Sequence, residues 1–266
     1  QRSHIDLSLY SEIKKYKYGD ELLNSVKWGI LLVADYSTLD LINRLNKIGK
    51  NIDEIDGCLS IGQGLNVDCV NLEQISKFPF VEKALIPIFT EGAVFAIKKS
   101  NTFLINKKKL SKNEIQKIEK VNLPLFDPDK TTKQPPVLVM PRGVSKFYCA
   151  RNEISAYSAS GVDIYDNEKL LSEEQLMNLW LFLNSSIAWL LREISGRKNL
   201  GGGLLKAEAI DLKPFPILFD FNNLKEIKKI YTKLSTRESL DSLLEIDTPE
   251  HKRIDEIVAS FIGLNE

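Results

Sequence analysis

The chain has 266 residues, enough for one large domain or two ordinary ones. Its content of 43% apolar and 27% charged residues is typical of a soluble globular protein. The formal net charge of zero excludes a chain that is polybasic or polyacidic as a whole.

The cysteines indicate a reducing, cytoplasmic compartment. Cys58, Cys69 and Cys149 are an odd number without the CxxC spacing of a zinc site, so we expect neither a disulfide framework nor a bound metal. The apolar run 175–191 contains Asn and Ser residues and is too short and too polar to span a membrane. Because the chain begins at Gln1, we expect it to be a fragment of a longer protein.

Residues 1–50 are amphipathic with helical spacing. Leu39, Ile42, Leu45 and Ile48 recur every three residues, and Gly49 is a suitable helix stop. We interpret this segment as a helical connector from an upstream domain that is absent from the chain.

Residues 51–217 open with a β-rich pattern. Short apolar runs separated by Gly, Ser and Asn predict strands at 84–89, 93–97, 102–105, 137–140, 147–150, 154–157 and 162–165. One helix, 111–121, starts at a capping box formed by Ser111 and Glu114, and the proline-rich stretch 123–136 is a predicted loop. Asp163 and Asp166 are expected to be turn and cap residues rather than part of a nuclease site.

Two glycines two residues apart mark the start of this region. The backbone amides of Gly62, Gln63 and Gly64 could cradle a phosphate, but the motif lacks the third glycine of a dinucleotide site. A tight turn between two strands remains the alternative.

Positive charge is concentrated between residues 92 and 151, where Lys and Arg outnumber Asp and Glu by nine. Lys98 and Lys99 lie at one predicted strand end, and Arg142 and Arg151 lie at two others. Such placement suits contact with a sugar–phosphate backbone, and arginines can also reach guanine edges. A solvated lysine-rich loop is the alternative interpretation.

The stretch 172–217 contains the most apolar element. A capping box of Ser172 and Gln175 starts a predicted single long buried helix that ends at Gly196. Basic residues and three consecutive glycines follow, a costly arrangement that favours close approach of another backbone, although a flexible hinge would also explain it. The pattern of the tail 218–266 predicts helices at 223–236 and 248–261, and His251, in a charged helix, is expected on the surface.

Four motifs together resemble a known family. They are Leu183-Asn184-Ser185, the glycines 201–203, the strap Leu-Lys-Pro-Phe-Pro-Ile at 212–217 and Arg-Ile-Asp-Glu-Ile-Val at 253–258. This order resembles the C-terminal specificity region of TaqI-like adenine-N6 DNA methyltransferases, which also occurs in fused restriction-modification enzymes. The resemblance covers about residues 50–263 and includes the turn 61–66 and the predicted strand 137–140.

The resemblance implies a module that reads a short sequence in double-stranded DNA while the target adenine flips into a catalytic domain. The fold it implies is α+β: a β-rich DNA-recognition module at 51–217, a long buried helix within it, and a helical C-terminal segment at 218–266. Together with the strand-end lysines, the candidate DNA-binding residues are Gly62, Gln63, Gly64, Asn66, Lys98, Lys99, Arg142, Lys146, Arg151, Arg197, Lys198, Gly201, Gly202, Gly203 and Lys206.

The catalytic Asn-Pro-Pro-Tyr motif of that family is absent from the sequence, whose only Pro-Pro step is Pro135-Pro136. We therefore expect the chain to be non-catalytic alone. Its expected partners are DNA and a catalytic methyltransferase domain, in the parent chain or on another subunit, that would carry S-adenosylmethionine. The alternative is a protein-docking module for a methylase or nuclease subunit, with no DNA reading of its own.

Overall fold

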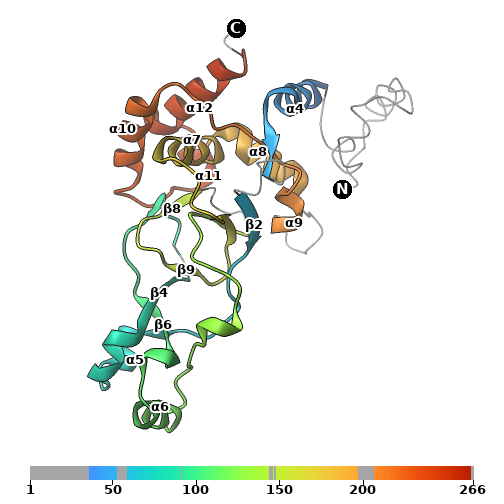
Figure 1. The fold of residues 1–266 in the computed structure, drawn as a ribbon. Helices are drawn as coiled ribbons and strands as arrows, with labels where there is room; N and C mark the ends of the chain where they lie inside the picture. Colours follow the sequence, from blue (N-terminus) through green and yellow to red (C-terminus); the bar gives the residue numbers. More distant parts are fainter. Residues whose placement is uncertain are drawn as a thin grey trace, which may run out of the picture.

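Two sheets, each with its own helices, organise the chain. The computed structural model describes residues 36–52, 59–90, 92–143, 146, 148–196 and 207–264. Most of the helices gather around the larger sheet at one end of the molecule, while β4, β6, α5 and α6 form a smaller lobe at the other (Figure 1). The predicted α+β class is confirmed.

The larger sheet has five strands in the order β2-β10-β7-β8-β5. Strand β10, the second in this order, pairs antiparallel with β2 on one side and β7 on the other, so that Val162 lies opposite both Gln63 and Met140. All five residues of β10 are buried. The strand bounds are Leu59–Gln63 (β2), Ala96–Ile97 (β5), Leu138–Met140 (β7), Ala150–Asn152 (β8) and Val162–Asp166 (β10).

The small lobe is built mainly from residues 65–135, between β2 and β7. Its sheet has the order β3-β6-β4-β9, with strands Val70–Asn71 (β3), Leu85–Phe89 (β4), Thr102–Ile105 (β6) and Tyr157–Ser158 (β9). Its helices are Leu72–Ile75 (α5), Lys112–Glu119 (α6) and the 3-10 turns Pro79–Ala84 (η2), Lys107–Lys109 (η3) and Pro128–Lys130 (η4). The predicted capping box of Ser111 and Glu114 is present.

One hydrophobic core joins the larger sheet to both ends of the described chain. It includes Ile42 and Leu45 of α4 (Tyr36–Ile48), and Ile227 and Ile254 from the C-terminal helices. Strand β1 (Lys50–Asn51) pairs with β11 (Pro216–Ile217). The C-terminal helices are Leu224–Leu234 (α10), Ser242–Glu245 (α11) and Pro249–Phe261 (α12). The core thus extends across the predicted segment boundaries at 50 and 217.

The single long helix predicted after Ser172 is wrong, because the structure has two helices there. They are α7 (Glu173–Leu183) and α8 (Ser186–Ser195), and Asn184 and Ser185 separate them. Asn184 donates to the carbonyl oxygens of Trp180 and Cys149 over 2.8 and 3.0 Å and accepts from the amide of Cys149 over 2.8 Å. Ser185 then caps α8 by accepting from the amide of Ala188. Side chains that bond to backbone groups in this way compete with continued helix.

The described residues contain no helix long and apolar enough to cross a membrane. Both α7 and α8 are instead packed into the core, with Trp180 fully buried and its indole nitrogen donating to the carbonyl of Phe95 over 3.1 Å. A short helix, α9 (Ala209–Leu212), follows the undescribed stretch 197–206 and contacts β2.

His251 was predicted to lie on the surface, and this is wrong, since its side chain is buried. Its ring packs on Trp189 with centroids 4.4 Å apart, and its Nε2 atom lies 3.1 Å from the Ser186 hydroxyl. Asp255 accepts from the Ser186 amide over 2.7 Å and from its hydroxyl over 2.6 Å. Burial lowers the pKa of His251, which favours the neutral ring. These contacts hold the start of α8 against α12.

We predict that Asn184→Ala destabilises the fold by about 2–4 kcal/mol, because it leaves the buried amide and carbonyl of Cys149 without partners. Urea unfolding measures the change. Asn113→Ala, at an exposed position of α6, is the matched control and should change the free energy of unfolding by less than about 0.5 kcal/mol. Equal effects of the two substitutions would contradict a structural role for the Asn184 contacts.

Candidate nucleic-acid interface

Gly62 and Gln63 lie in strand β2, and Gly64 follows its end, packed against the turn that precedes β10. A Cβ atom added to Gly64 would lie 2.5 Å from the carbonyl oxygen of Ser158, so only glycine fits. The Gly64 amide donates to the carbonyl of Gly161 over 3.0 Å. Because this amide already has a partner inside the protein, close packing of the end of β2 accounts for Gly64 better than the predicted phosphate cradle or tight turn does.

Lys133, from the predicted proline-rich loop, binds the backbone at this end of β2. Its ammonium donates to the carbonyl oxygens of Gln63 and Gly64 over 2.6 and 3.0 Å. The sequence analysis missed this residue, since nothing local distinguishes Lys133 from the other lysines of its region. Lys133 acquires its role only when the loop 123–136 folds against the end of β2.

A buried carboxyl group, that of Asp163, lies on β10 in the residue that pairs with Gly62. Asp163 is 1% exposed and accepts a hydrogen bond from the hydroxyl of Tyr165 over 2.9 Å. Burial raises the pKa of Asp163 to about 6, against the opposing effects of the Ser158 and Tyr165 hydroxyls and the charge of Lys133. Asp163 is therefore a buried sheet residue rather than a turn residue. Asp166, as predicted, holds a turn by accepting from the amides of Leu170 and Leu171.

Gln63 and Arg142 meet at one carboxylate. The side-chain amide of Gln63 donates to Oε2 of Glu208 over 3.0 Å, and a guanidinium nitrogen of Arg142 donates to Oε1 over 2.9 Å. Glu208 is only 17% exposed and Arg142 is 30% exposed, so the ion pair is partly shielded from water. We call these three residues the Glu208 cluster. The sequence analysis missed Glu208, whose position after the glycine run gave no sign of this role.

The described residues on either side of the stretch 197–206 are both tied to the end of β7. Arg192, near the end of α8, donates to the carbonyl oxygen of Pro141. On the other side, the amide of Ala207 donates to the carbonyl oxygen of Arg142 over 3.1 Å. Arg192 and Ala207 thus both contact the end of β7, close to Arg142 of the Glu208 cluster. Six candidate residues within the stretch 197–206 lie outside the described residues: Arg197, Lys198, Gly201, Gly202, Gly203 and Lys206.

Arg151 lies in a different environment from Arg142. It forms a two-pronged ion pair with Glu173 of α7, with both distances 2.8 Å, and its guanidinium lies 5.6 Å from the ring centre of Tyr231 on α10. These contacts join β8 to two helices. The geometry gives Arg151 a structural role in the described protein, and its predicted DNA contact has no support from its neighbours.

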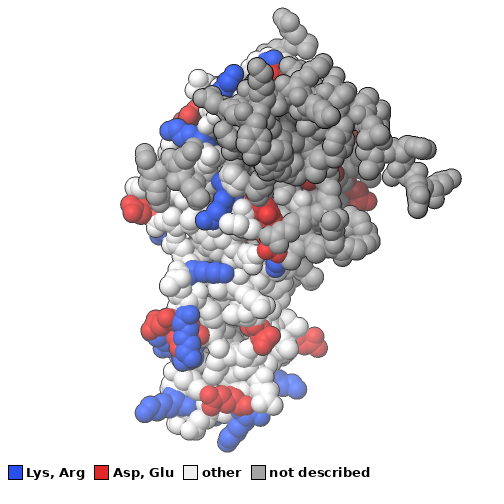
Figure 2. Space-filling view, turned by 90° about the vertical axis from the view of Figure 1, so that its right-hand side faces the viewer, with Lys and Arg blue, Asp and Glu red and all other residues white. Residues whose placement is uncertain are grey.

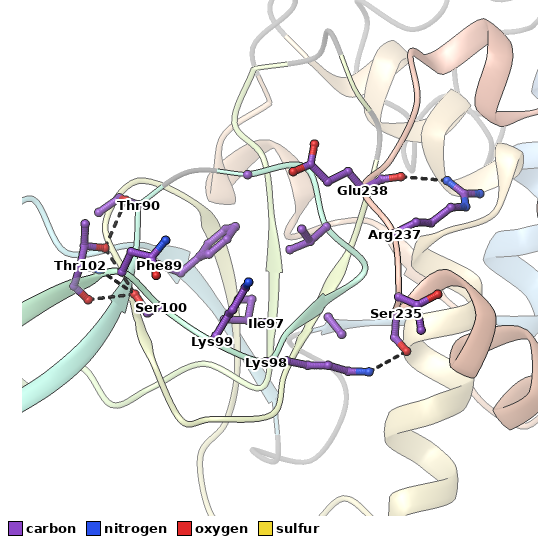
Figure 3. Close-up of a pocket in the computed structure, with 15 residues that line it drawn as sticks. Phe89, Thr90, Ile97, Lys98, Lys99, Ser100, Thr102, Ser235, Arg237 and Glu238 are labelled. Atoms are coloured by element: carbon purple, nitrogen blue, oxygen red, sulfur yellow. Dashed lines mark hydrogen bonds between the residues drawn. The ribbon is translucent and has the colours of Figure 1, made fainter. Parts of the chain in front are cut away.

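The remaining candidates are spread over other surfaces. Lys98 and Lys99 line a cavity of about 550 Å³ where the small lobe meets the end of α10 (Figure 3). Asn66 lines a separate hollow of about 900 Å³ between the loops at 65–68 and 124–133. Lys146 is half-buried. Of the described candidates, the structure therefore brings together Gln63 and Arg142 but not the whole set.

Part of the positive charge of the region 92–151 is neutralised locally. Lys107 pairs with Asp127 over 2.6 Å, and Lys108 pairs with Asp129. Figure 2 shows Lys and Arg side chains interspersed with Asp and Glu side chains on the face that it displays. The surplus of nine already subtracts Asp127 and Asp129, but Arg142 and Arg151 pair with Glu208 and Glu173 outside the region, so the count still overstates the positive charge that is free for a ligand.

Comparison of the chain with protein-family models and with curated proteins found no match. The resemblance to TaqI-like specificity regions thus stays a prediction. Among the described residues, no group of three or more His, Cys, Asp or Glu side chains could hold a metal ion. What the geometry offers is a set of polar and cationic hydrogen-bond donors around Glu208.

We predict that Asp163→Asn changes the pH dependence of stability. The folded protein holds the Asp163 proton up to about pH 6, whereas the ordinary pKa of a free Asp side chain is 3.8. Ionisation of the buried group therefore costs stability as the pH rises through this range, by up to about 3 kcal/mol above pH 6. Asn keeps a neutral oxygen for the Tyr165 hydroxyl and removes that cost.

The measurement is urea unfolding of both proteins from pH 4.5 to 8. The free energy of unfolding of Asp163→Asn, relative to the unsubstituted protein, should increase between pH 4.5 and 6.5 and then level off. A difference that stays constant over the whole range would show that Asp163 has an ordinary pKa. Asp247→Asn, at a 75% exposed side chain of the tail, is the control for loss of a carboxylate.

Proposed function

We propose that this chain is the sequence-specific, double-stranded DNA recognition part of a restriction-modification adenine-N6 methyltransferase. The catalytic domain and its S-adenosylmethionine site would belong to another part of the parent protein or to a partner subunit. The observation that carries the proposal is the convergence of Gln63 and Arg142 on Glu208, next to Ala207, the first described residue after the basic stretch 197–206.

The side chains of the Glu208 cluster are of the kinds that read bases. A guanidinium can donate two hydrogen bonds to guanine O6 and N7, and a glutamine amide can pair in a similar way with adenine. In the free protein these donors face a carboxylate, which presents acceptor oxygens as a base edge or a phosphate does. The cluster therefore holds two base-reading groups ordered before DNA arrives.

The basic stretch 197–206 supplies the second element of such an interface. It contains Arg197, Lys198 and Lys206 around three glycines, and its flanking residues are anchored beside Arg142. Backbone contacts from cationic side chains position a protein on DNA, while base contacts specify the sequence. Under the proposal, Gln63 and Arg142 read bases and the cations of this stretch contact the DNA backbone.

A docking module remains the second candidate, supported by exposed leucines near α11. Leu240, Leu243 and Leu244 are 42%, 78% and 62% exposed, which is unusual for three leucines so close in sequence. Such residues suit contact with another protein chain. The two functions are separated by whether the protein binds duplex DNA by itself.

We predict that the protein binds short duplexes at low salt, with an affinity that falls steeply as salt rises. Arg197→Gln with Lys198→Gln should weaken binding about tenfold and reduce the slope of log affinity against log salt by about 2, since each phosphate contact contributes about 0.9. Fluorescence anisotropy at several salt concentrations measures both quantities.

Lys225→Gln with Lys228→Gln, at exposed positions of α10, is the matched control because it removes the same charge from another surface. It should leave the slope unchanged. Absence of duplex binding by the unsubstituted protein even at low salt would reject the DNA function and favour docking. Equal effects of the two double substitutions would reject the assignment of the interface to the stretch 197–206.

We also predict that Arg142→Ala relaxes recognition at one base position by about 1–3 kcal/mol, the usual value of a bidentate base contact. Selection from a pool of random duplexes, performed with both proteins, measures this as loss of preference at that position. Urea unfolding checks that Arg142→Ala still folds. Glu208→Gln checks whether loss of the carboxylate alone changes the base preference. If Arg142→Ala unfolds the protein, or weakens binding to all duplexes equally, Arg142 serves the structure or the backbone rather than base reading.

A further inference from the structure

The cavity beside Lys98 and Lys99 lies where three segments meet. They are the end of β4 with Thr90, the turn 98–101 between β5 and β6, and residues 235–238 after α10. At about 550 Å³, the cavity is within the range of small-ligand sites. Figure 3 shows Lys99 between Thr90 and Thr102 on one side and Arg237 and Glu238 on the other, while Lys98 points toward Ser235.

The walls of this cavity are held in place by contacts within the protein. The amide of Ser239 donates to the carbonyl of Ala93 over 2.6 Å, which fixes the tail segment to the stretch before β5. Arg237 forms a two-pronged ion pair with the buried Glu245, at 2.8 and 2.6 Å, and lies over the ring of Phe95. Arg237 is therefore a fixed part of the cavity lining, and Glu245 largely balances its charge.

Among the residues that the structure describes, Lys98 has no carboxylate partner of the kind that several other lysines have. Its ammonium donates to the Ser235 hydroxyl over 2.9 Å, and that hydroxyl donates in turn to the carbonyl of Thr232. Lys83, Lys107 and Lys233, in contrast, each pair with an Asp or Glu. An ammonium group has three donors, so a neutral hydroxyl leaves two of them for a ligand.

We propose that this junction cavity binds a phosphate group through Lys98 and Lys99, with Ser235 as an orienting hydroxyl. Both lysines line this one cavity, and ammonium groups match the charge and the several acceptor oxygens of phosphate. Glu238 lies at the exposed side of the cavity and opposes an anion. The phosphate comes from the backbone of bound DNA, contacted some distance from the Glu208 cluster. This choice of source rests on the proposed function.

The first experiment uses pyrophosphate as the probe, with isothermal titration calorimetry at low ionic strength. Lys98→Gln with Lys99→Gln should weaken pyrophosphate binding at least about tenfold, because it removes two charge-assisted donors. Glu238→Gln should strengthen it, because the opposing carboxylate is lost. Lys112→Gln, an exposed lysine of α6, should have no effect. All four lie on the surface, so the variants should fold, and urea unfolding checks this.

The second experiment measures duplex binding by the same variants. Weaker duplex binding by Lys98→Gln with Lys99→Gln, together with competition between duplex and pyrophosphate, supports a DNA phosphate in the cavity. Pyrophosphate binding that depends on both lysines, in a protein that binds no duplex, supports the cavity with a free phosphorylated molecule as its ligand and rejects the proposed DNA function.

Three outcomes overturn the inference. The first is no pyrophosphate binding together with duplex binding that the lysine substitutions leave unchanged, which would retain the DNA function. The second is binding of citrate as strong as that of pyrophosphate, which would reject phosphate as the ligand class. The third is weakening by Lys112→Gln equal to that of the cavity substitutions, which would show only a general effect of charge.

Discussion

The contacts of Asn184 determine how the rest of the molecule is arranged. By bonding to both backbone groups of Cys149, this side chain fastens the end of α7 to the segment that leads into β8 and ends the helix there. The chain then restarts as α8, whose first residue Ser186 is held by Asp255 of α12. Near its other end, Arg192 reaches the carbonyl of Pro141. One buried amide thus directs α8 so that its Arg192 contacts the end of β7.

The elements that the sequence predicted well are those with local causes. The helix that begins after Ser111 and the one that begins after Ser172 both start at capping boxes, in which a hydroxyl and an acid or amide three residues apart bond to each other's backbone. The tail helices follow from 3.6-residue spacing. The strand after residue 162 follows from apolar residues bounded by glycine and turn residues. Each of these signals lies within a few residues of the element it specifies.

The errors and omissions have a common physical origin in contacts between distant residues. Helical periodicity predicts that 172–196 is continuous, and only Cys149, 35 residues before Asn184, reveals the break. His251 looked exposed because its sequence neighbours are charged, yet Trp189 covers its ring. Glu208 and Lys133 are ordinary charged residues until folding places Gln63 next to both. Gln63 and Arg142 could thus be named from residue type, but the Glu208 carboxylate that both contact could not.

The Glu208 cluster has a consequence for selectivity under the proposed function. If DNA displaced Glu208 from Arg142 and Gln63, a partly buried carboxylate would lose two donors, and such a loss costs about 1–3 kcal/mol or more for a charged group. Only a base pair that returns at least two good acceptors could offset this cost. If Glu208 instead stays in place, it fixes the direction in which Arg142 presents its remaining donors. In both cases the carboxylate penalises a wrong base more than it aids a right one, which is how discrimination arises from a small number of contacts.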